Sequence, residues 1–391
     1  MAGILFWTCL LAIFYVYAGY PLLVSLLARF RPQTPVFPEH LPGLTLIIAA
    51  YNEEKVMAAK LENCLNLDYP RNRLQILIAA DGSSDRTVEI VHSFARQGIE
   101  LSFSEQRRGK AAAINRAIKQ ARHEIVVFSD ANNSYDSQAL KHLARPFSDP
   151  GIGAVTGSKS LLKSESHLAQ ADNLYWRYES FLKTQETRIG CTVGVAGEIL
   201  ALRRSLFKPI PERIINDDFF LALKVISKGF RVIYVPEARS FEKASCNEKQ
   251  EQVRRVRIVA GRYQAMLISL KILPLSRPLL LWQVFSHKFL RPLVPFFLIG
   301  ALLANLAVLL FPVLHPPAWL FLAPPWALIF FVLQIVFYSM AMIGLFFKPR
   351  GLLGKIIYLP AFLVNSNYAA LVGLLRYLTG NQTALWEKAA R

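Results

Sequence analysis

Long apolar stretches alternate along this chain with segments of mixed polarity. The first runs from Ile4 to Ala28 without a charged side chain, and about 20 apolar residues are enough to cross a bilayer. It lacks the basic start and the small-residue cleavage site of a signal peptide. Because Arg29 and Arg31 follow it, we expect residues 1–30 to form a retained membrane anchor whose C-terminal end faces the cytosol.

A proline-rich stretch at 31–43 predicts an extended linker, and residues 44–265 after it carry most of the charge. There, short apolar runs alternate with helical patterns, which predict strands at 44–49, 74–80 and 124–129 and helices at 54–67, 85–97 and 111–121. Apolar strands that alternate with helices are typical of an α/β fold with a largely parallel sheet covered on both faces. We therefore expect one cytosolic α/β domain at 44–265.

The remaining chain is again apolar. Residues 266–291 mix Leu, Trp and Phe with Lys, Arg and His, and prolines interrupt them, which predicts an interfacial amphipathic segment. We expect transmembrane helices in a bundle at 292–378, followed by a tail at 379–391 near the cytosolic face.

The bundle contains two clear span candidates, 292–311 and 319–347, joined by an uncharged loop. The positive-inside rule predicts that they cross outward and back, because three basic residues follow them: Lys348, Arg350 and Lys355. The last apolar stretch, 356–375, has basic residues on both sides. The sequence leaves open whether it crosses the bilayer, re-enters it or lies against the bundle.

Composition agrees with a protein that is part membrane and part water-soluble, since 53% of the 391 residues are hydrophobic and 18% are charged. The formal net charge of +18 fits cytosolic basic residues beside a membrane, together with arginines that bind an anionic substrate. The apolar segments weigh against a nucleic-acid partner. Four cysteines have no zinc or disulfide spacing, and we expect reduced thiols: Cys9, Cys64, Cys191 and Cys246.

Polar and acidic residues follow three of the predicted strands directly. They are Asn52 and Glu53, then Asp81, then Asp130 and Asn132. In an open parallel sheet, ligands bind outside the carboxyl ends of the strands, so these groups should converge on one crevice. A lone acidic residue at such a place can simply cap a helix, which is what we expect of Asp85.

Carboxylates in a crevice accept hydrogen bonds from sugar hydroxyls and base N–H groups, or bind phosphate through a divalent cation. The chain has no G-x-G-x-x-G after its first strand and no P-loop, which weighs against a dinucleotide oxidoreductase or an NTPase. A nucleoside diphosphate held through Mg²⁺ or Mn²⁺ fits these residues better.

The order of these motifs resembles that of family 2 glycosyltransferases with the GT-A fold. The residues that carry the resemblance are Ala50-Tyr51-Asn52-Glu53, Asp81-Gly82-Ser83-Ser84-Asp85, Gly109-Lys110 with Asn115, and Ser129-Asp130-Ala131-Asn132. The later part of the chain is similar to the membrane-embedded branch, the cellulose, hyaluronan and poly-N-acetylglucosamine synthases.

The resemblance implies roles in donor binding. Asn52 and Glu53 would line the nucleoside pocket, Asp81 would hold the base or ribose, and Lys110 would help to neutralise the diphosphate. Asp130 matches the first carboxylate of the D-x-D metal motif. Asn132 stands where the family has the second one, so a metal bound here would have less ligand charge.

The resemblance also implies a transfer site. Gly197 and Glu198 fall in the acceptor-binding stretch, where glycine allows a sugar to approach the backbone. The acidic pair matches Asp217-Asp218, and we expect Asp218 to be the general base, because a neighbouring carboxylate raises its pKa.

Gln252 and Arg255 match the Q-x-x-R-W motif of the processive synthases and would stabilise the leaving nucleoside diphosphate. Val256 replaces the family's Trp, which leaves processive transfer open. For Arg254 and Arg257, a basic belt beside the membrane is the alternative.

Together these features predict an inverting, metal-dependent hexosyltransferase in the membrane of a bacterial cell, with its catalytic domain in the cytosol. The donor would be a nucleotide-sugar, first of all a UDP-sugar, and the acceptor a growing saccharide whose export the bundle could assist. The alternative is a single addition to a membrane lipid carrier. A transporter with a nucleotide-sensing domain is a third hypothesis, which predicts ionisable groups buried within the spans.

Overall fold

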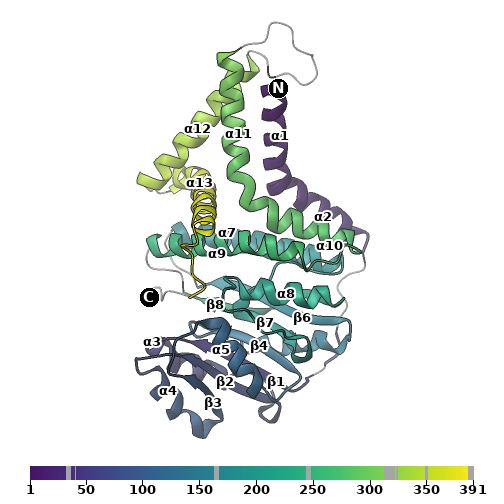
Figure 1. Cartoon of the computed structure of the whole chain (residues 1–391), viewed down its shortest axis with the longest axis vertical. Coiled ribbons are helices and arrows are strands. Elements are labelled where there is room, and N and C mark those ends of the chain that lie inside the picture. Colours follow the sequence, from purple (N-terminus) through teal and green to yellow (C-terminus); the bar gives the residue numbers. More distant parts are fainter. Residues whose placement is uncertain are drawn as a thin grey trace.

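The computed structural model describes residues 1–31, 37–39, 41–162, 167–243, 248–311, 322, 325–347 and 351–385. A broad α/β domain lies at one end of the molecule and a narrow stalk of apolar helices at the other, with a layer of crossing helices between them (Figure 1). Much of the linker at 31–43, Cys246, and the tail residues 386–391 lie outside the described residues. The other cysteines, Cys9, Cys64 and Cys191, are free thiols.

The α/β domain is built on one eight-stranded sheet within the described part of the chain. In spatial order its strands are β3 (Ile99–Ser104), β2 (Leu74–Asp81), β1 (Leu44–Ala50), β4 (Ile125–Asp130), β7 (Leu200–Arg203), β6 (Ile152–Leu161), β8 (Arg231–Glu242) and β5 (Asn133–Tyr135). The first four strands are parallel to one another, as are β6 and β8. β7 runs antiparallel to both neighbours, and β5 to β8. The prediction of an α/β fold with a largely parallel sheet is confirmed.

Helices cover both faces of the sheet, which explains why its central strands are buried along most of their length and largely apolar. Side chains alternate between the faces, so Leu46 and Ile48 join one hydrophobic cluster and Ile47 joins the other. The first cluster includes residues of α3 (Glu54–Leu65), α4 (Thr87–Ser93) and α6 (Ala139–Ala144). The second includes residues of α5 (Lys110–Ala117) and α8 (Asp217–Ser227).

Above the sheet, two long helices separate the α/β domain from the stalk. They are α7 (His167–Arg188) and α9 (Glu248–Leu270), and they cross the molecule beneath the apolar helices (Figure 1). The N-terminal segment packs on this layer, because α2 (Tyr20–Arg29) contacts α7. A shorter helix, α10 (Pro278–Val284), lies beside them.

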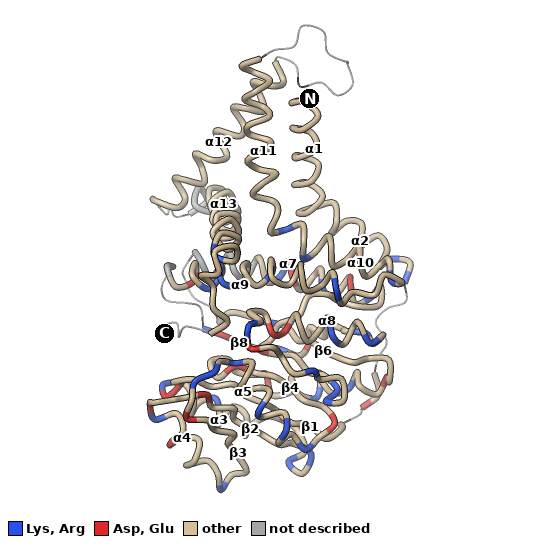
Figure 2. The backbone as a smooth tube through the Cα atoms, viewed as in Figure 1, with Lys and Arg blue, Asp and Glu red and all other residues tan. Residues whose placement is uncertain are grey.

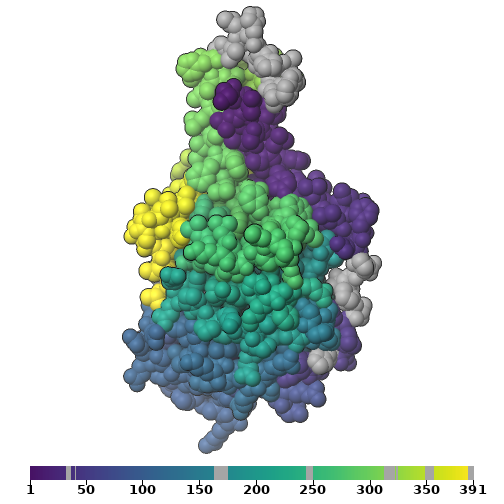
Figure 3. Space-filling model, turned by 45° about the vertical axis from the view of Figure 1, so that its right-hand side comes forward, coloured from purple at the N-terminus to yellow at the C-terminus, as the bar shows by residue number. Residues whose placement is uncertain are grey.

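The stalk contains α1 (Ala2–Phe14), α11 (Leu290–Leu310) and α12 (Trp326–Phe347), with α13 (Gly351–Leu378) below α12. Four helical segments of the described chain are long and apolar enough to cross a membrane: Ala2–Arg29, Pro278–Leu310, Trp326–Phe347 and Ile356–Leu378. Lys, Arg, Asp and Glu are concentrated in the α/β domain and the crossing layer, and the upper stalk is almost free of them (Figure 2). The space-filling view shows the narrow stalk rising from the broad domain (Figure 3).

Two of the apolar segments bend at π-helical turns, Tyr15–Gly19 and Phe285–Phe289. The turns meet: the Tyr15 hydroxyl lies 2.7 Å from that of Ser286 and accepts a hydrogen bond from Trp282 Nε1 at 2.8 Å. The helical segment Pro278–Leu310 therefore begins in the crossing layer and continues into the stalk. Its bend, at Phe285–Phe289, lies near the end of residues 266–291, for which we expected an interfacial position. The stretch 356–375 is part of one continuous helix, α13, which packs against α9 and α12.

Candidate active site

The ends of β1 and β2 are tied together by Asn52. Its backbone is in the left-handed region, with φ of 53°, a conformation that asparagine tolerates better than most residues. Its side-chain oxygen accepts a hydrogen bond from the Ser84 N–H at 2.8 Å, and its own N–H donates to Ser83 Oγ at 3.1 Å. The next residue, Glu53, donates its N–H to Thr87 Oγ1 at 2.7 Å. The two strand ends expected to meet thus do so.

Asp81, at the end of β2, is buried and holds the loop that precedes α5. Its carboxylate accepts hydrogen bonds from the N–H groups of Arg108, at 3.1 Å, and Gly109, at 2.6 Å. Asp85 accepts from the N–H of Thr87 at 3.0 Å, as expected at a helix start, and from that of Glu54 at 3.1 Å. These two carboxylates shape the crevice by fixing its loops.

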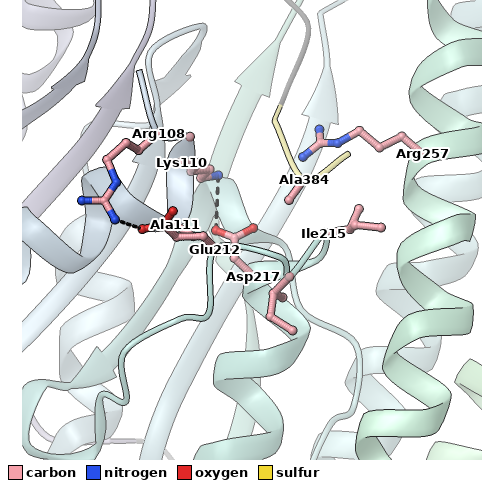
Figure 4. Close-up of a pocket in the computed structure, with 10 residues that line it drawn as sticks. Arg108, Lys110, Ala111, Glu212, Ile215, Asp217, Arg257 and Ala384 are labelled. Atoms are coloured by element: carbon pink, nitrogen blue, oxygen red, sulfur yellow. Dashed lines mark hydrogen bonds and ion pairs between the residues drawn. The ribbon is translucent and has the colours of Figure 1, made fainter. Parts of the chain in front are cut away.

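Lys110 lies where three elements converge: the start of α5, the end of β4 and the start of α8. Its ammonium is 2.6 Å from Asp130 Oδ1. It also lies 3.8 Å from Asp217 Oδ2 (Figure 4). Burial would lower the pKa of Lys110, but the two carboxylates outweigh it and raise that pKa. Burial likewise opposes ionisation of Asp130, and the Lys110 ammonium nevertheless keeps its pKa below the ordinary value. Both groups are therefore charged at neutral pH.

A small pocket opens beside this group, lined by residues that include Arg108, Lys110, Asp217, Arg257 and Ala384 (Figure 4). Arg257 reaches it from α9. Its Nε is buried and has no hydrogen-bond partner among the described residues, and burial lowers its pKa in spite of the nearby carboxylates. A pocket that gathers a buried lysine and an unsatisfied guanidinium is suited to an anion.

On the other side of α8, Asp218 lines a separate, large cavity of about 300 Å³. Burial and the adjacent Asp217 raise the pKa of Asp218, although it accepts a hydrogen bond from the Phe219 N–H at 2.7 Å. The two consecutive carboxylates thus line different cavities: Asp217 lines the small pocket and Asp218 lines the large cavity. A group transferred between the two spaces would pass this pair.

Gly197 also lines the large cavity and packs against Asp218. A Cβ at position 197 would lie 3.0 Å from Asp218 Cβ and 3.4 Å from its Oδ2. Glycine is therefore needed here for close approach to the carboxylate itself. Glu198 lines the cavity too, and burial raises its pKa despite an ion pair with Lys159 at 2.7 Å.

A buried polar group connects Glu198 to the expected metal motif. Lys159 also pairs with Glu242, and Asn132 donates its amide N–H to Glu242 Oε1 at 2.9 Å. The nitrogen of Asn132 is thus occupied, and its oxygen is the atom available to a cation. Among the described residues, no group of three or more His, Cys, Asp or Glu side chains is arranged to hold a metal.

Gln252 and Arg255, which we expected to contact the donor, do not line the small pocket. Arg255 lines the large cavity, with its Nε 3.1 Å from Glu251 Oε1 and its guanidinium over the Phe362 ring. Gln252 lines neither of the two spaces. The physical reason is the phase of α9: residues two apart on a helix are about 200° apart around its axis, so Arg257, and not Arg255, faces the small pocket.

Val256 is buried and does not line the large cavity. The aromatic walls of that cavity come from other elements: Tyr175 and Trp176 on α7, Phe219 on α8, and Phe362 on α13. Aromatic faces of this kind are suited to stacking on a sugar ring. No local sequence pattern marks these residues as neighbours, because they come from three different helices.

Comparison with known proteins identifies the α/β domain. The family described as glycosyl transferase family 2 matches residues 45–210. A poly-beta-1,6-N-acetyl-D-glucosamine synthase of Staphylococcus aureus (strain COL) is 30% identical over 207 residues, which are 51% of this chain and 50% of that protein. The synthase of the same name from Staphylococcus epidermidis is 29% identical over 217 residues, 54% of this chain and 52% of that one. The match thus spans about half the length of these curated relatives.

The solved structure of a mannosyltransferase from Pyrobaculum calidifontis, in complex with GDP-Man and Mn²⁺, is similar over nearly the whole molecule. Its TM-score is 0.72 at 23% identity, and the similarity covers 97% of this chain and 99% of that one. It shows that the arrangement of sheet, crossing layer and apolar helices is a shared fold. Residues 45–210 thus match the model of family 2 glycosyltransferases, and the chain shares the fold of this mannosyltransferase, a GT-A-like α/β domain joined to a set of apolar helices.

Proposed function

We propose that this protein is a membrane-bound, inverting glycosyltransferase that moves a sugar from a nucleoside diphosphate donor to an acceptor hydroxyl. The observation that carries the proposal is the position of Asp217 and Asp218 between a small pocket lined by Lys110 and Arg257 and a large cavity lined by aromatic rings. In this assignment the donor diphosphate occupies the small pocket and the acceptor the large cavity.

In the reaction, the acceptor oxygen attacks the anomeric carbon while Asp218 takes the proton of that hydroxyl. The bond between the anomeric carbon and the diphosphate oxygen breaks, and the nucleoside diphosphate leaves with the electron pair. General base catalysis of this kind is worth about 10²- to 10⁴-fold in rate. Burial and the Asp217 charge raise the pKa of Asp218, which makes its carboxylate a stronger base.

Lys110 and Arg257 would hold the diphosphate and stabilise the charge that grows on it, as preorganised cations do. Asn52, Glu53 and Asp81, at the ends of β1 and β2, would position the nucleoside. Gly197 and Glu198 would face the acceptor. We assign Arg255 to the acceptor side as well, because it lines the large cavity.

A divalent cation, Mg²⁺ or Mn²⁺, fits Asp130 and the free oxygen of Asn132. Such cations are commonly held by one or two carboxylates together with substrate phosphates, so a pair of protein ligands is enough. The cation would neutralise the diphosphate and favour its departure. The Lys110 ammonium, now 2.6 Å from Asp130, is placed to share the same phosphate oxygens.

The donor we propose to test first is a UDP-sugar, UDP-N-acetylglucosamine, because the curated relatives are named as synthases of an N-acetylglucosamine polymer. The apolar helices would lie in the plasma membrane of a bacterium, with the catalytic domain in the cytosol. The product would be a saccharide or a glycosylated lipid carrier.

The test uses the full-length protein in detergent with UDP-N-acetylglucosamine, other UDP-sugars and GDP-mannose, each with Mg²⁺ or Mn²⁺. We expect nucleotide release coupled to a glycosylated product in the native protein, and donor binding without product in Asp218→Asn. Product length separates a polymer from a single addition. Absence of sugar transfer from every donor, in protein shown to bind nucleotide and to be folded, would contradict the proposal.

A further inference from the structure

The large cavity reaches from the catalytic carboxylate to the membrane helices. Asp218 and Gly197 line one part of it, and Phe362, Ser366 and Ala369 of α13 line another. α13 contains one of the four segments that are long and apolar enough to cross a bilayer. A molecule that entered from the lipid could therefore place one end beside Asp218.

Lys183, on α7, is a buried cation that lines this cavity and forms no ion pair with any residue that the structure describes. Its side chain is among the largest fully buried ones, with 2% relative exposure. In the described part of the chain, its one recorded contact is with the Tyr234 ring, 4.6 Å from the ammonium. Burial lowers the pKa of Lys183 to about 8 even though Glu179 lies near enough to oppose this. An unpaired charge in such a place is costly, which points to a ligand that compensates it.

The carboxylates nearest to Lys183 on α7 are bound to other groups. Glu179 pairs with Arg291 and with His287. Glu186 lies 2.7 Å from His287 Nδ1 and accepts hydrogen bonds from the Thr192 hydroxyl and the Val193 N–H. Among the described residues, neither carboxylate forms an ion pair with the Lys183 ammonium, and their more distant charges do not offset the effect of burial on its pKa.

Two further cations face the same cavity. Lys288, at the π-helical turn, has a recorded contact with the Phe219 ring at 5.9 Å and no ion pair among the described residues. Arg262, on α9, donates a hydrogen bond to the Tyr175 hydroxyl at 3.4 Å. Lys288 is close enough to Lys183 to disfavour the charge of that lysine. By contrast, Arg254 in the same cavity is paired with Glu251 at 2.9 Å.

We propose that Lys183, Lys288 and Arg262 bind the phosphate or diphosphate of a lipid-linked acceptor, whose apolar chain leaves the cavity along α13. A phosphate offers several charged oxygens to three cations from three different elements. A neutral saccharide would leave the three cations uncompensated. The donor diphosphate has its own cations, Lys110 and Arg257, in the small pocket. This assignment rests on the proposed function and names its acceptor class.

The test measures equilibrium binding to the full-length protein in detergent, without donor, so that it does not depend on transfer. The probes are a radiolabelled polyprenyl phosphate, the matching uncharged polyprenol, inorganic phosphate and a neutral N-acetylglucosamine oligosaccharide. The variants are Lys183→Met and Lys288→Met, which keep side-chain length and remove charge. Lys228→Met, an exposed lysine after α8, is the control.

We expect the native protein to bind polyprenyl phosphate at least about ten-fold more tightly than polyprenol, since a charged hydrogen bond is worth about 1.5–3 kcal/mol. Each variant should lose about ten-fold in affinity for the phosphate and none for the alcohol, while the control changes neither. Inorganic phosphate should compete only at concentrations far above those of the lipid. Retained nucleotide binding shows that a variant is folded. If Lys183→Met does not fold, Lys288→Met alone tests the proposal.

Equal binding of phosphate and alcohol by the native protein would overturn the proposal, as would variants that bind both as the native protein does. Inorganic phosphate that competes as well as the lipid would indicate a site for a free anion and contradict the lipid assignment. Tight, lysine-independent binding of the oligosaccharide would identify a neutral acceptor. If sugar transfer fails with every donor while the binding pattern holds, the proposed function fails and the anion site stands. If transfer to a saccharide proceeds but the binding pattern is absent, the proposed function stands and the anion site fails.

Discussion

The Lys110 ammonium lies 2.6 Å from the Asp130 carboxylate. The Lys110 ammonium thus lies beside the carboxylate that we propose as a ligand of the divalent metal. This arrangement keeps Asp130 ionised before any substrate arrives, because Lys110 lowers the pKa of Asp130 against the effect of burial. If Asp130 binds a metal as proposed, no proton has to leave its carboxylate first.

Replacing Lys110 should therefore weaken donor binding. We expect Lys110→Gln to raise the KM for the donor by about ten-fold or more, since one charge-assisted hydrogen bond is lost. Lys119→Gln, at an exposed lysine beyond the end of the same helix, is the matched control. Steady-state nucleotide release at varied donor concentration measures both. An unchanged KM in Lys110→Gln would place the diphosphate elsewhere.

The pH dependence of transfer should report Asp218. A general base works only when it is deprotonated, and the pKa of Asp218 is raised by burial and by Asp217. The rate should therefore fall with decreasing pH earlier than an ordinary aspartate would allow. Asp217→Asn removes one of the two causes, so the acid limb of the profile of kcat against pH should move to lower pH. A shift in the opposite direction would show that Asp217 does not act on Asp218 in this way.

Metal removal should stop turnover. A chelator is expected to abolish transfer, and added Mn²⁺ or Mg²⁺ should restore it. Asp130→Asn leaves only neutral oxygens from positions 130 and 132 and should raise the metal concentration needed for half-maximal activity by about ten-fold or more. Asp136→Asn, in the loop after β5, serves as the control. Full activity in the presence of chelator would exclude the metal role of Asp130.

Arg255 and Arg257 give a matched pair of variants on one helix. Arg257→Gln should raise the KM for the donor, because Arg257 lines the small pocket. Arg255→Gln should raise the KM for the acceptor instead, because Arg255 lines the large cavity. Kinetics at varied concentration of each substrate separate the two. If both variants affect the same substrate, the division of the site between the two cavities is wrong.

The polar group around Glu186 should contribute to stability. Glu186 is fully buried and bonded to Tyr20, Thr192, Val193 and His287. Glu186→Gln weakens these bonds and should cost about 1–3 kcal/mol of unfolding free energy, seen as a lower melting temperature in detergent. Glu237→Gln, at an exposed position of β8, should change it little. Equal melting temperatures for the two variants would contradict this role.

The central strands and the crevice could be predicted from sequence because their signals are local. β1, β2 and β4 are short apolar runs with polar residues at their ends, and both faces are buried. β3 was missed because Ile99–Ser104 is a half-buried edge strand with an irregular pattern. The helix predicted at 85–97 is shorter, since α4 ends at Ser93 and a tight turn follows.

The two sides of the active site could not be separated from sequence. Arg255 and Arg257 belong to one basic run, and their division between two cavities depends on how α9 is turned toward the sheet. Lys183 and Lys288 are far apart along the chain and meet only because the turn at Phe285–Phe289 packs beside α7. Neither relationship has a local pattern that marks it.

The hydrogen bonds of Glu186 also determine the order in which parts of this protein can assemble during synthesis. They join Tyr20 of the N-terminal helical segment, Thr192 in the loop after α7, and His287. During synthesis, the anchor and the loop leave the ribosome well before His287 does. A nascent chain whose sheet is complete thus still lacks His287, which contacts Glu186 beside this loop. The contacts of Glu186 can therefore form completely only after the segment that contains His287 has been synthesised.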